Sequence, residues 1–331
     1  MTYQELINKI VQLQEEGLEL FNAGKSVLGK NILATHIGDY TGPQVLFQAG
    51  IHSREHITTL LLIEIARNLH NNQLVTGGGI YFIFLTNPDG AEIALDGLNS
   101  VNCEITKQYF TFANGGSLDF SRFKANYNLV DLNTNFDANW GQGSQNVFCP
   151  SVENFVGYYP NSEREVQSLI NFTMQTKPLI TVSYHSKGNI IYYGFDNQSE
   201  SNITRDQAIG NSISELTGYP LIFTENSTGG YKDWCIDKLK IPAYTIEVGD
   251  DSLPHPIEEE NLPEIYQRNK DVPLLVLEKA KEYSKAIDFN TSFVQNIKHE
   301  RKNKSYENSN GARLQSLLKT RNTNRRCNSK E

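Results

Sequence analysis

The chain has 331 residues, of which 38% are hydrophobic and 10% aromatic, which excludes a wholly disordered protein and allows a sizeable core. The formal net charge is -8, but residues 298–331 hold ten basic and three acidic residues, so the rest of the chain is strongly acidic. An acidic body argues against nucleic acid as a partner.

The first predicted element is an amphipathic helix within residues 1–20, MTYQELINKIVQLQEEGLEL. This stretch lacks the basic and apolar regions of a secretory signal peptide. No run approaches the roughly 18 apolar residues that cross a bilayer, so we expect no transmembrane segment. The four cysteines show no paired spacing, which favours a reducing, cytoplasmic setting, although export without a leader stays open.

Four β-rich runs are the predicted strands of a central sheet. Their nearly continuous apolar character is typical of strands that are buried on both faces. In chain order they are QVLFQAG (44–50), GIYFIFLTN (79–87), LITVSYHS (179–186) and PAYTIEVG (242–249).

Predicted helices alternate with these strands. The run HITTLLLIEIARNLH starts one after the first strand, and Ser162 starts another, where Ser-Glu-Arg-Glu predicts a capping box with Glu165. A further helix is expected from about Pro263 to Ile287. The alternation of strands and helices predicts an α/β fold.

The segment 89–161 is rich in Gly, Asn, Asp and aromatic residues and has little periodicity, so we expect it to be functional. No interdomain linker precedes the polar C-terminal end. We therefore expect one domain over residues 1–288 and a basic, disordered tail over residues 289–331.

Chemically useful side chains stand at the ends of three predicted strands. His52 and Glu55 follow the first strand, His185 ends the third and Glu247 ends the fourth. Sites in α/β sheets commonly form at such strand ends. Two histidines and one carboxylate leave a fourth zinc position open, as in catalytic zinc sites, and a second carboxylate nearby would complete a hydrolase. Taken singly, such a residue is more often an ordinary core or loop residue, and only the combination favours a metal site.

Six motifs in this order resemble those of the zinc metallocarboxypeptidases of the carboxypeptidase A type: GIHSREH, NPDG, VDLNTNFDANW, SYHS, GGYKDW and TIEVG. The resemblance covers about residues 1–288. It implies a three-layer α/β/α fold with a mixed, mostly parallel central sheet. It also implies a zinc peptidase with one Zn²⁺ per chain.

The resemblance assigns roles to individual residues. His52, Glu55 and His185 would bind the zinc ion, and Glu247 would be the general base. The developing oxyanion needs a further cation. In the family this cation follows an aromatic residue, which favours Lys124 here and leaves Arg122 as the alternative.

Two departures from the family concern the substrate. The family grips a C-terminal carboxylate with an Asn-Arg pair, but here Asn133 is followed by Thr134, which lacks the guanidinium fork. The family's substrate-covering tyrosine is absent from its usual place, and Tyr231 is the nearest substitute.

A lysine in the expected specificity pocket is a further departure. Lys232 stands at the position that forms the base of the family's specificity pocket, where it would favour a carboxylate on the leaving side. A solvated helix lysine is the alternative. Lys187 adds a second cation near the expected cleft.

These departures, with the VDLN and SYHSKG forms, are similar to the bacterial branch of the family that cleaves the γ-D-glutamyl bond to meso-diaminopimelate in murein peptides. We therefore expect a peptidase that acts on a murein-derived peptide. Three alternatives remain: an ordinary metallocarboxypeptidase that releases C-terminal amino acids, a zinc deacylase of small N-acyl amino acids, and a non-catalytic peptide-binding homologue. The sequence leaves the oligomeric state open.

Other polar residues have structural interpretations. Asp89 and Asp131 are expected to shape turns or to orient metal ligands. His56 is expected to face solvent at the start of its helix, and His255 is expected to be a loop residue. Arg54 could contact substrate or pair with a neighbouring acid.

Overall fold

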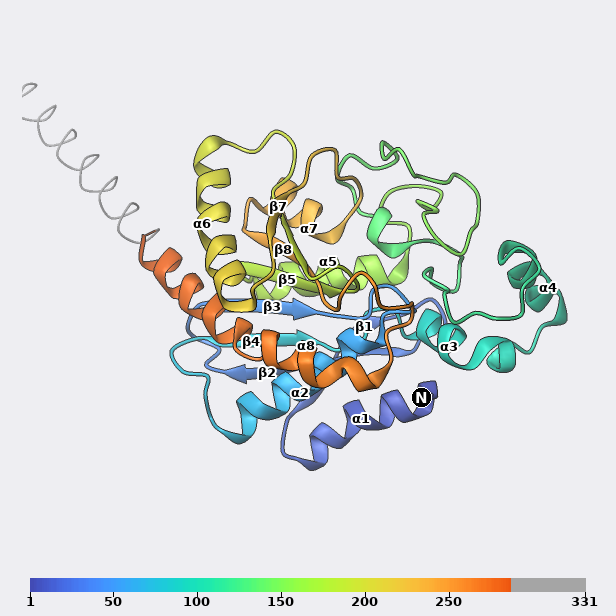
Figure 1. Cartoon of the computed structure of the whole chain (residues 1–331), viewed down its shortest axis with the longest axis horizontal. Coiled ribbons are helices and arrows are strands. Elements are labelled where there is room, and N and C mark those ends of the chain that lie inside the picture. Colours follow the sequence, from blue (N-terminus) through green and yellow to red (C-terminus); the bar gives the residue numbers. More distant parts are fainter. Residues whose placement is uncertain (287–331) are drawn as a thin grey trace, which may run out of the picture. The chain divides into compact units, whose positions relative to one another are not determined.

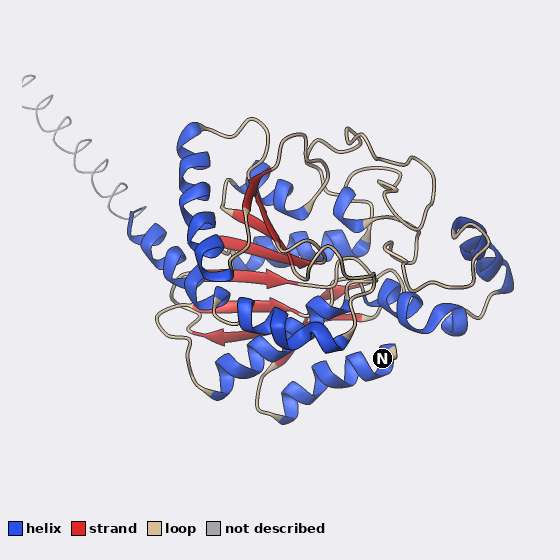
Figure 2. Cartoon of the chain, in the orientation of Figure 1, coloured by secondary structure: helices blue, strands red, loops and turns tan. Residues whose placement is uncertain are grey.

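The computed structural model describes residues 1–286, and Figures 1 and 2 show its fold. Residues Met1–Lys281 form one compact unit. Among residues 1–286, no helix combines the length and hydropathy that a bilayer-spanning segment requires. The predicted tail, residues 289–331, lies outside the described residues, as does the predicted helix end at Ile287.

A mixed sheet forms the middle of the described chain, with eight strands in the order β1-β2-β4-β3-β5-β8-β6-β7. Strand β3 is parallel to β4 and β5, β5 to β8, and β6 to β7, whereas the pairs β1-β2, β2-β4 and β6-β8 are antiparallel. The prediction of a mixed, mostly parallel sheet is therefore confirmed. The strands are β1 Leu20–Lys25, β2 Asn31–Gly38, β3 Gln44–Gln48, β4 Gly79–Ile83, β5 Ile180–His185, β6 Ile190–Tyr193, β7 Leu221–Phe223 and β8 Ala243–Glu247.

The four predicted strands are β3, β4, β5 and β8, which lie together in the sheet. Every residue of β3 and of β5 is buried, as their apolar runs indicate. The sequence did not predict β1, β2, β6 and β7. Strands β1 and β7 contain no fully buried residue and β7 is only three residues long, so neither carries a strong apolar signal.

Helices cover both faces of the sheet (Figure 2). The helices of the described residues are α1 Tyr3–Glu15, α2 His56–Asn71, α3 Pro88–Asp96, α4 Glu104–Ala113, α5 Arg164–Thr176, α6 Glu200–Thr217, α7 Tyr231–Trp234 and α8 Leu262–Asn269, of which α4 lies to the side of the sheet (Figure 1). Residues 272–281 are also helical. Short turns of tighter or wider helix are η1 Gly97–Ser100, η2 Leu132–Thr134, η3 Cys235–Leu239 and η4 Glu259–Asn261.

Two apolar clusters divide the core at the sheet. Residues of α1, α2, α6 and α8 pack in one cluster, and residues of α5 and α7 pack in the other. Strand alternation explains the division, because Val45 and Phe47 join the first cluster while Leu46, between them, joins the second. The three-layer α/β/α prediction is confirmed.

The predicted capping box at the start of α5 is wrong. The helix begins at Arg164, and Glu163 at its N-cap makes no side-chain capping bond. The Glu165 carboxylate instead accepts the backbone N–H of Val27 at 3.0 Å, which ties α5 to the turn between β1 and β2. A tertiary contact therefore replaces the local one.

Residues 89–161 hold more regular structure than predicted, since α3 and α4 both contribute to this segment. The predicted helix near Pro263 exists, but α8 ends at Asn269 before the chain becomes helical again at residue 272. The N-terminal helix α1 is confirmed, and Thr2 and Glu5 form a capping box at its start.

Candidate metal centre and active site

The centre forms where parallel strands β3 and β5 end side by side. Gln48, the last residue of β3, pairs with Ser183 of β5, and His185 is the last residue of β5. The turn after β3 carries His52 and Glu55 to the same edge just before α2 begins. One ligand atom each from His52, Glu55 and His185 lie within 4.8 Å of one another, and all three residues are buried.

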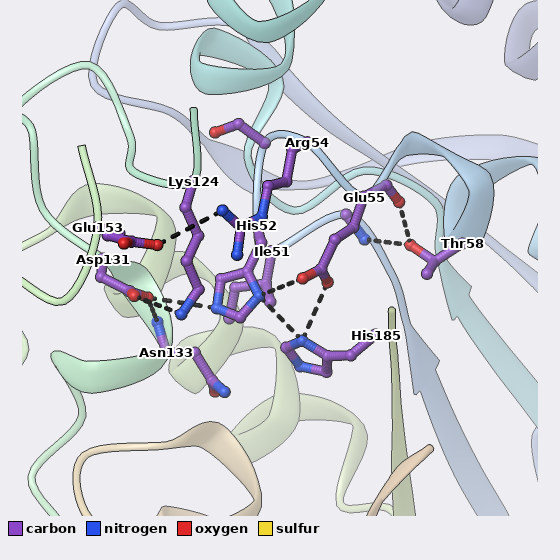
Figure 3. A network of polar contacts seen from close by, with 12 residues as sticks. Ile51, His52, Arg54, Glu55, Thr58, Lys124, Asp131, Asn133, Glu153 and His185 are labelled. Carbon is purple, nitrogen blue, oxygen red and sulfur yellow. Dashed lines mark hydrogen bonds and ion pairs between the residues drawn. The ribbon is translucent and has the colours of Figure 1, made fainter. Parts of the chain in front are cut away.

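Figure 3 shows how these three side chains converge. His52 Nδ1 lies 2.8 Å from Glu55 Oε1, and His185 Nδ1 lies 3.1 Å from Glu55 Oε2. The two Nδ1 atoms are 3.1 Å apart. Two ring nitrogens and a carboxylate that face one point are suited to a single cation.

The charge of the ligand set also fits zinc. Burial raises the pKa of Glu55, but His52 and His185 lower it further, so the pKa lies well below its usual value. The buried carboxylate is therefore ionised. Two imidazoles and one carboxylate leave a fourth position of tetrahedral zinc for water or substrate, so the residues fit a catalytic rather than a structural zinc ion.

Asp131 lies behind the first histidine. Its Oδ1 is 3.3 Å from His52 Nε2, and its Oδ2 is 2.9 Å from Lys124 Nζ. It also accepts the backbone N–H groups of Asn133 and Asn154 at 3.1 Å. Burial raises the pKa of Asp131, but Lys124 and His52 lower it well below its usual value. As expected, Asp131 is placed to orient a metal ligand.

Asp89, the other aspartate that was expected to shape a turn or to orient a metal ligand, has different partners. Asp89 accepts the backbone N–H of Leu28 at 2.8 Å and lies 3.4 Å from Lys30 Nζ. It therefore shapes the contact between α3 and the β1-β2 turn.

Lys124 and Arg122 differ in their relation to the centre. The Lys124 ammonium joins the network around His52 through Asp131 (Figure 3). The Lys124 backbone carbonyl also accepts the N–H of Ser53 at 3.3 Å, which fixes this loop against the metal-binding turn. The contact found for Arg122 is through its carbonyl, which accepts Arg54 Nη1 at 3.1 Å.

Glu247 lies directly beside the metal ligands. It ends β8, where its Cα pairs in parallel register with that of His185. Burial raises the pKa of Glu247 to about 7, with His185 lowering it and Glu55 raising it. A carboxyl group with this pKa can take up and release a proton near neutral pH.

A cavity of about 220 Å³ opens beside Glu247. It is lined by Asn133, Tyr192, Thr224, Ser227, Thr228, Gly230, Lys232, Asp233, Thr245 and Glu247. The motifs GGYKDW and VDLNTN therefore meet here, far apart in sequence. Gly229 permits this approach, since a Cβ at its position would lie 2.3 Å from the Thr134 carbonyl oxygen.

Lys232 lines this cavity but is not solvated. Its side chain is 6% exposed. Its ammonium donates to the Gly194 carbonyl at 2.6 Å, to Thr224 Oγ1 at 2.9 Å and to Asp233 Oδ1 at 2.6 Å. An ammonium has three donors, so all of them are used. The alternative of a solvated helix lysine is wrong.

Tyr231 and Thr134 turn away from the cavity. The Tyr231 side chain is 1% exposed, its hydroxyl is 2.7 Å from Thr173 Oγ1, and its ring stacks on Trp234. The Thr134 hydroxyl donates to the Asp131 carbonyl at 2.9 Å. Neither side chain is among the residues that line the cavity, so their contact with substrate stays a prediction, whereas Asn133 does line the cavity.

Three further basic residues, Arg54, Lys187 and His255, lie near the turn that carries His52 and Glu55. Arg54 pairs with Glu153 at 3.4 Å, and Lys187 pairs with Asp251 at 3.2 Å. His255 is a loop residue, as expected, but it also lies within electrostatic reach of Arg54 and Lys187. No feature of the sequence signals that its loop returns to this place.

His56 contradicts the expectation of a solvent-facing side chain. It is the first residue of α2 and is only 5% exposed. Burial lowers the pKa of His56 to about 4. The residue is therefore a neutral part of the packed helix start.

Comparisons with known proteins agree with this architecture. A family model described as zinc carboxypeptidase matches residues 3–271. The gamma-D-glutamyl-L-diamino acid endopeptidase 1 of Lysinibacillus sphaericus is 30% identical over 273 residues, which cover 78% of this chain and 67% of that protein. The resemblance expected from the six motifs is confirmed.

Solved structures share the fold. Carboxypeptidase A from Helicoverpa armigera superposes with a TM-score of 0.66 at 20% identity, over 86% of this chain and 74% of that one. Murein-tripeptide amidase MpaA from Escherichia coli O157 superposes with a TM-score of 0.51 at 22% identity. The superposition covers 77% of this chain and 91% of that one. The chain spans about half to two thirds of the length of the curated relatives that it matches.

Proposed function

This chain belongs to the zinc carboxypeptidase family, and we therefore propose that it is a zinc-dependent peptidase that hydrolyses an amide bond. The observation that carries the proposal is the buried convergence of His52, Glu55 and His185 beside Glu247. This arrangement combines a three-residue metal site with a proton-accepting carboxyl group. A non-catalytic binding protein would not need the second carboxyl group.

The proposed roles follow from these positions. His52, Glu55 and His185 hold zinc, which when bound supplies Lewis acidity that acidifies water and polarises a carbonyl. Glu247 accepts the proton of the attacking water and delivers it to the leaving amine, for which a pKa of about 7 is suited. Asp131 holds the imidazole of His52 from behind.

We assign Lys124 to stabilise the oxyanion that develops at the scissile carbonyl. Its ammonium lies 2.9 Å from Asp131, which in turn lies 3.3 Å from His52. A fixed cation next to the metal site favours negative charge at the reacting carbonyl. Arg122 reaches the same region through its backbone carbonyl, so Lys124 is the stronger assignment.

We further propose that the substrate is a murein-derived peptide with a γ-D-glutamyl bond to diaminopimelate. Two points support it. The relative from Lysinibacillus sphaericus is named as a gamma-D-glutamyl-L-diamino acid endopeptidase. Asn133 lines the cavity without a following arginine, so the cavity lacks the fork that grips a terminal carboxylate in ordinary carboxypeptidases.

We propose that Lys232, which lines the cavity, binds a carboxylate on the leaving side of the substrate. The Lys232 ammonium already donates to Asp233. A substrate carboxylate must therefore compete with Asp233 for it. A purely structural Lys232, which ties Gly194 and Thr224 to α7, is the competing interpretation.

The substrate proposal is tested with the zinc-loaded full chain and a panel of peptides. We expect cleavage of L-Ala-γ-D-Glu-meso-diaminopimelate at the γ-D-glutamyl bond, identified by product mass. Hippuryl amino acids serve as substrates for an ordinary carboxypeptidase, and short N-acyl amino acids as substrates for a deacylase. Cleavage of hippuryl or acyl substrates alone would reject the murein proposal and leave the zinc hydrolase intact.

We also propose a reducing, cytoplasmic setting. Cys103 and Cys149 are free and exposed, which suits a compartment where disulfides do not persist. Fractionation of cells that produce the natural chain tests this, and recovery outside the cytoplasm would contradict it.

A further inference from the structure

Two basic side chains flank the metal ligands without lining the cavity beside Glu247. Arg54 lies between His52 and Glu55 in the metal-binding turn, and Lys187 follows His185 by two residues. Neither belongs to the residues that line that cavity. The chain therefore carries positive charge next to the metal centre but outside the proposed leaving-group cavity.

The Lys187 ammonium has a hydrogen-bond donor that is not used among the described residues. Among the described residues its ammonium donates to Asp251 alone, through the backbone carbonyl and through Oδ1 at 3.2 Å. The Asp251 side chain is 88% exposed, so the ion pair is screened by water and weak. Two acceptors leave one ammonium donor free.

Arg54 also has an unused donor. Its Nη1 donates to the Arg122 carbonyl at 3.1 Å and to Glu153 at 3.4 Å. Its Nε is buried and has no hydrogen-bond partner within residues 1–286. A buried donor without an acceptor is unfavourable, so the Arg54 side chain would gain a hydrogen bond by shifting toward an incoming acceptor.

Arg54 and Lys187 both affect the same side chain, that of His255. Burial, followed by Arg54 and then by Lys187 and Arg122, lowers the pKa of His255 to about 4, with Glu55 opposing. Arg54 and Lys187 therefore both lie within electrostatic reach of His255. Lys232, by contrast, has every donor used and a carboxylate beside it, so its charge is already balanced.

We propose that Arg54 and Lys187 bind a carboxylate on the acyl side of the scissile bond. This inference rests on the proposed function. A γ-linked glutamyl residue carries its free α-carboxylate on the acyl side, a short carbon chain from the scissile carbonyl. An α-linked residue with an uncharged side chain offers no carboxylate there. The pair would thus distinguish γ-glutamyl bonds from ordinary peptide bonds.

The experiment compares two substrates and matched lysine variants of the zinc-loaded full chain. One substrate is L-Ala-γ-D-Glu-meso-diaminopimelate, and the other has the glutamyl α-carboxylate converted to an amide. We expect the wild type to prefer the carboxylate form in kcat/KM by about tenfold or more, as charge-assisted bonds imply. Lys187→Ala should remove most of this preference by slowing the carboxylate substrate, and Lys187→Arg should keep it.

Lys281→Ala is the matched control. Lys281 is 19% exposed and pairs with the exposed Glu278, much as Lys187 is 15% exposed and pairs with Asp251, but it lies on the C-terminal helix. It should leave the preference unchanged. Equal cleavage of both substrates by the wild type, or a full preference in Lys187→Ala, would overturn this inference while the proposed function stands. Cleavage of neither substrate would instead overturn the murein-peptide part of the proposed function, on which this inference rests.

Discussion

At the scale of single residues, the metal site depends on which ring nitrogen of His52 carries the proton. Asp131 Oδ1 lies 3.3 Å from Nε2 of His52, so the ionised carboxylate favours a proton on Nε2. The Nδ1 lone pair then faces Glu55 and His185, where a cation would bind. Asp131 is therefore placed to orient the proposed ligand His52.

This role predicts a defined loss of metal affinity. Asp131→Ala removes the partner of His52 and should weaken zinc binding about 10- to 100-fold. Asp131→Asn should weaken it less, because the amide keeps a polar oxygen beside His52 Nε2. The measurement is a zinc competition titration with a chromophoric chelator.

Asp89→Ala is the control for this prediction. Asp89 is also a buried carboxylate, but it binds the Leu28 N–H and Lys30 rather than a metal ligand. It should lower the free energy of unfolding without changing zinc affinity. Equal zinc affinity in wild type and Asp131→Ala would contradict the positioning role of Asp131.

Lys232 illustrates why the sequence predicts a position better than a role. Its place at the cavity was inferred from the GGYKDW motif, and the cavity does include it. Two of its partners, Gly194 and Thr224, come from the ends of β6 and β7, which the sequence did not predict. The neighbouring Asp233 was visible in the sequence, but its side-chain direction was not.

At the scale of elements, the first turn of α5 contains a buried carboxyl group, that of Glu165, with a raised pKa. Glu165 accepts the Val27 N–H, and burial raises the pKa of Glu165 to about 7, against a usual value of 4.5. The folded state therefore binds this proton more tightly than the unfolded state. Stability from Glu165 is complete below about pH 4.5 and is lost as the pH rises through about 7.

Glu165→Gln should flatten this part of the pH profile. The wild type should lose about 3 kcal/mol of unfolding free energy from this group between pH 4.5 and pH 8, and the variant should not. Urea unfolding of the metal-free chain at both pH values measures the difference, with other groups cancelling between the two proteins. An identical pH dependence in the two proteins would contradict the raised pKa.

The same helix shows the limit of local rules. Ser162, Glu163 and Glu165 have the spacing of a capping box, yet Glu165 bonds to Val27 in a distant turn. Local spacing cannot reveal that competing partner. The strands β3 and β5 were predictable because both faces are buried, whereas β1 and β7 were not, because they are largely solvent-accessible.

At the scale of the whole molecule, the sheet explains why a discontinuous site could be anticipated. His52, His185 and Glu247 follow or end the neighbouring strands β3, β5 and β8, and parallel strands deliver their ends to one edge. The sequence therefore indicated which residues meet. It could not indicate that the His255 loop comes to the same edge, since no strand carries it there.

Charge is distributed unevenly over the molecule. The chain has a net charge of -8, yet Arg54, Lys124 and Lys187 lie around the metal centre. Cations placed beside the metal centre of an acidic protein can attract an anionic substrate to that place. This distribution agrees with a peptide that carries several carboxylates.

The most direct test of the central claim is a paired measurement on Glu247→Gln. Zinc content by atomic spectroscopy should stay at one ion per chain, because His52, Glu55 and His185 are untouched. Turnover of the best peptide substrate should fall by at least about 100-fold, since the proton acceptor is gone. Wild-type turnover in a variant that retains its zinc would contradict the account.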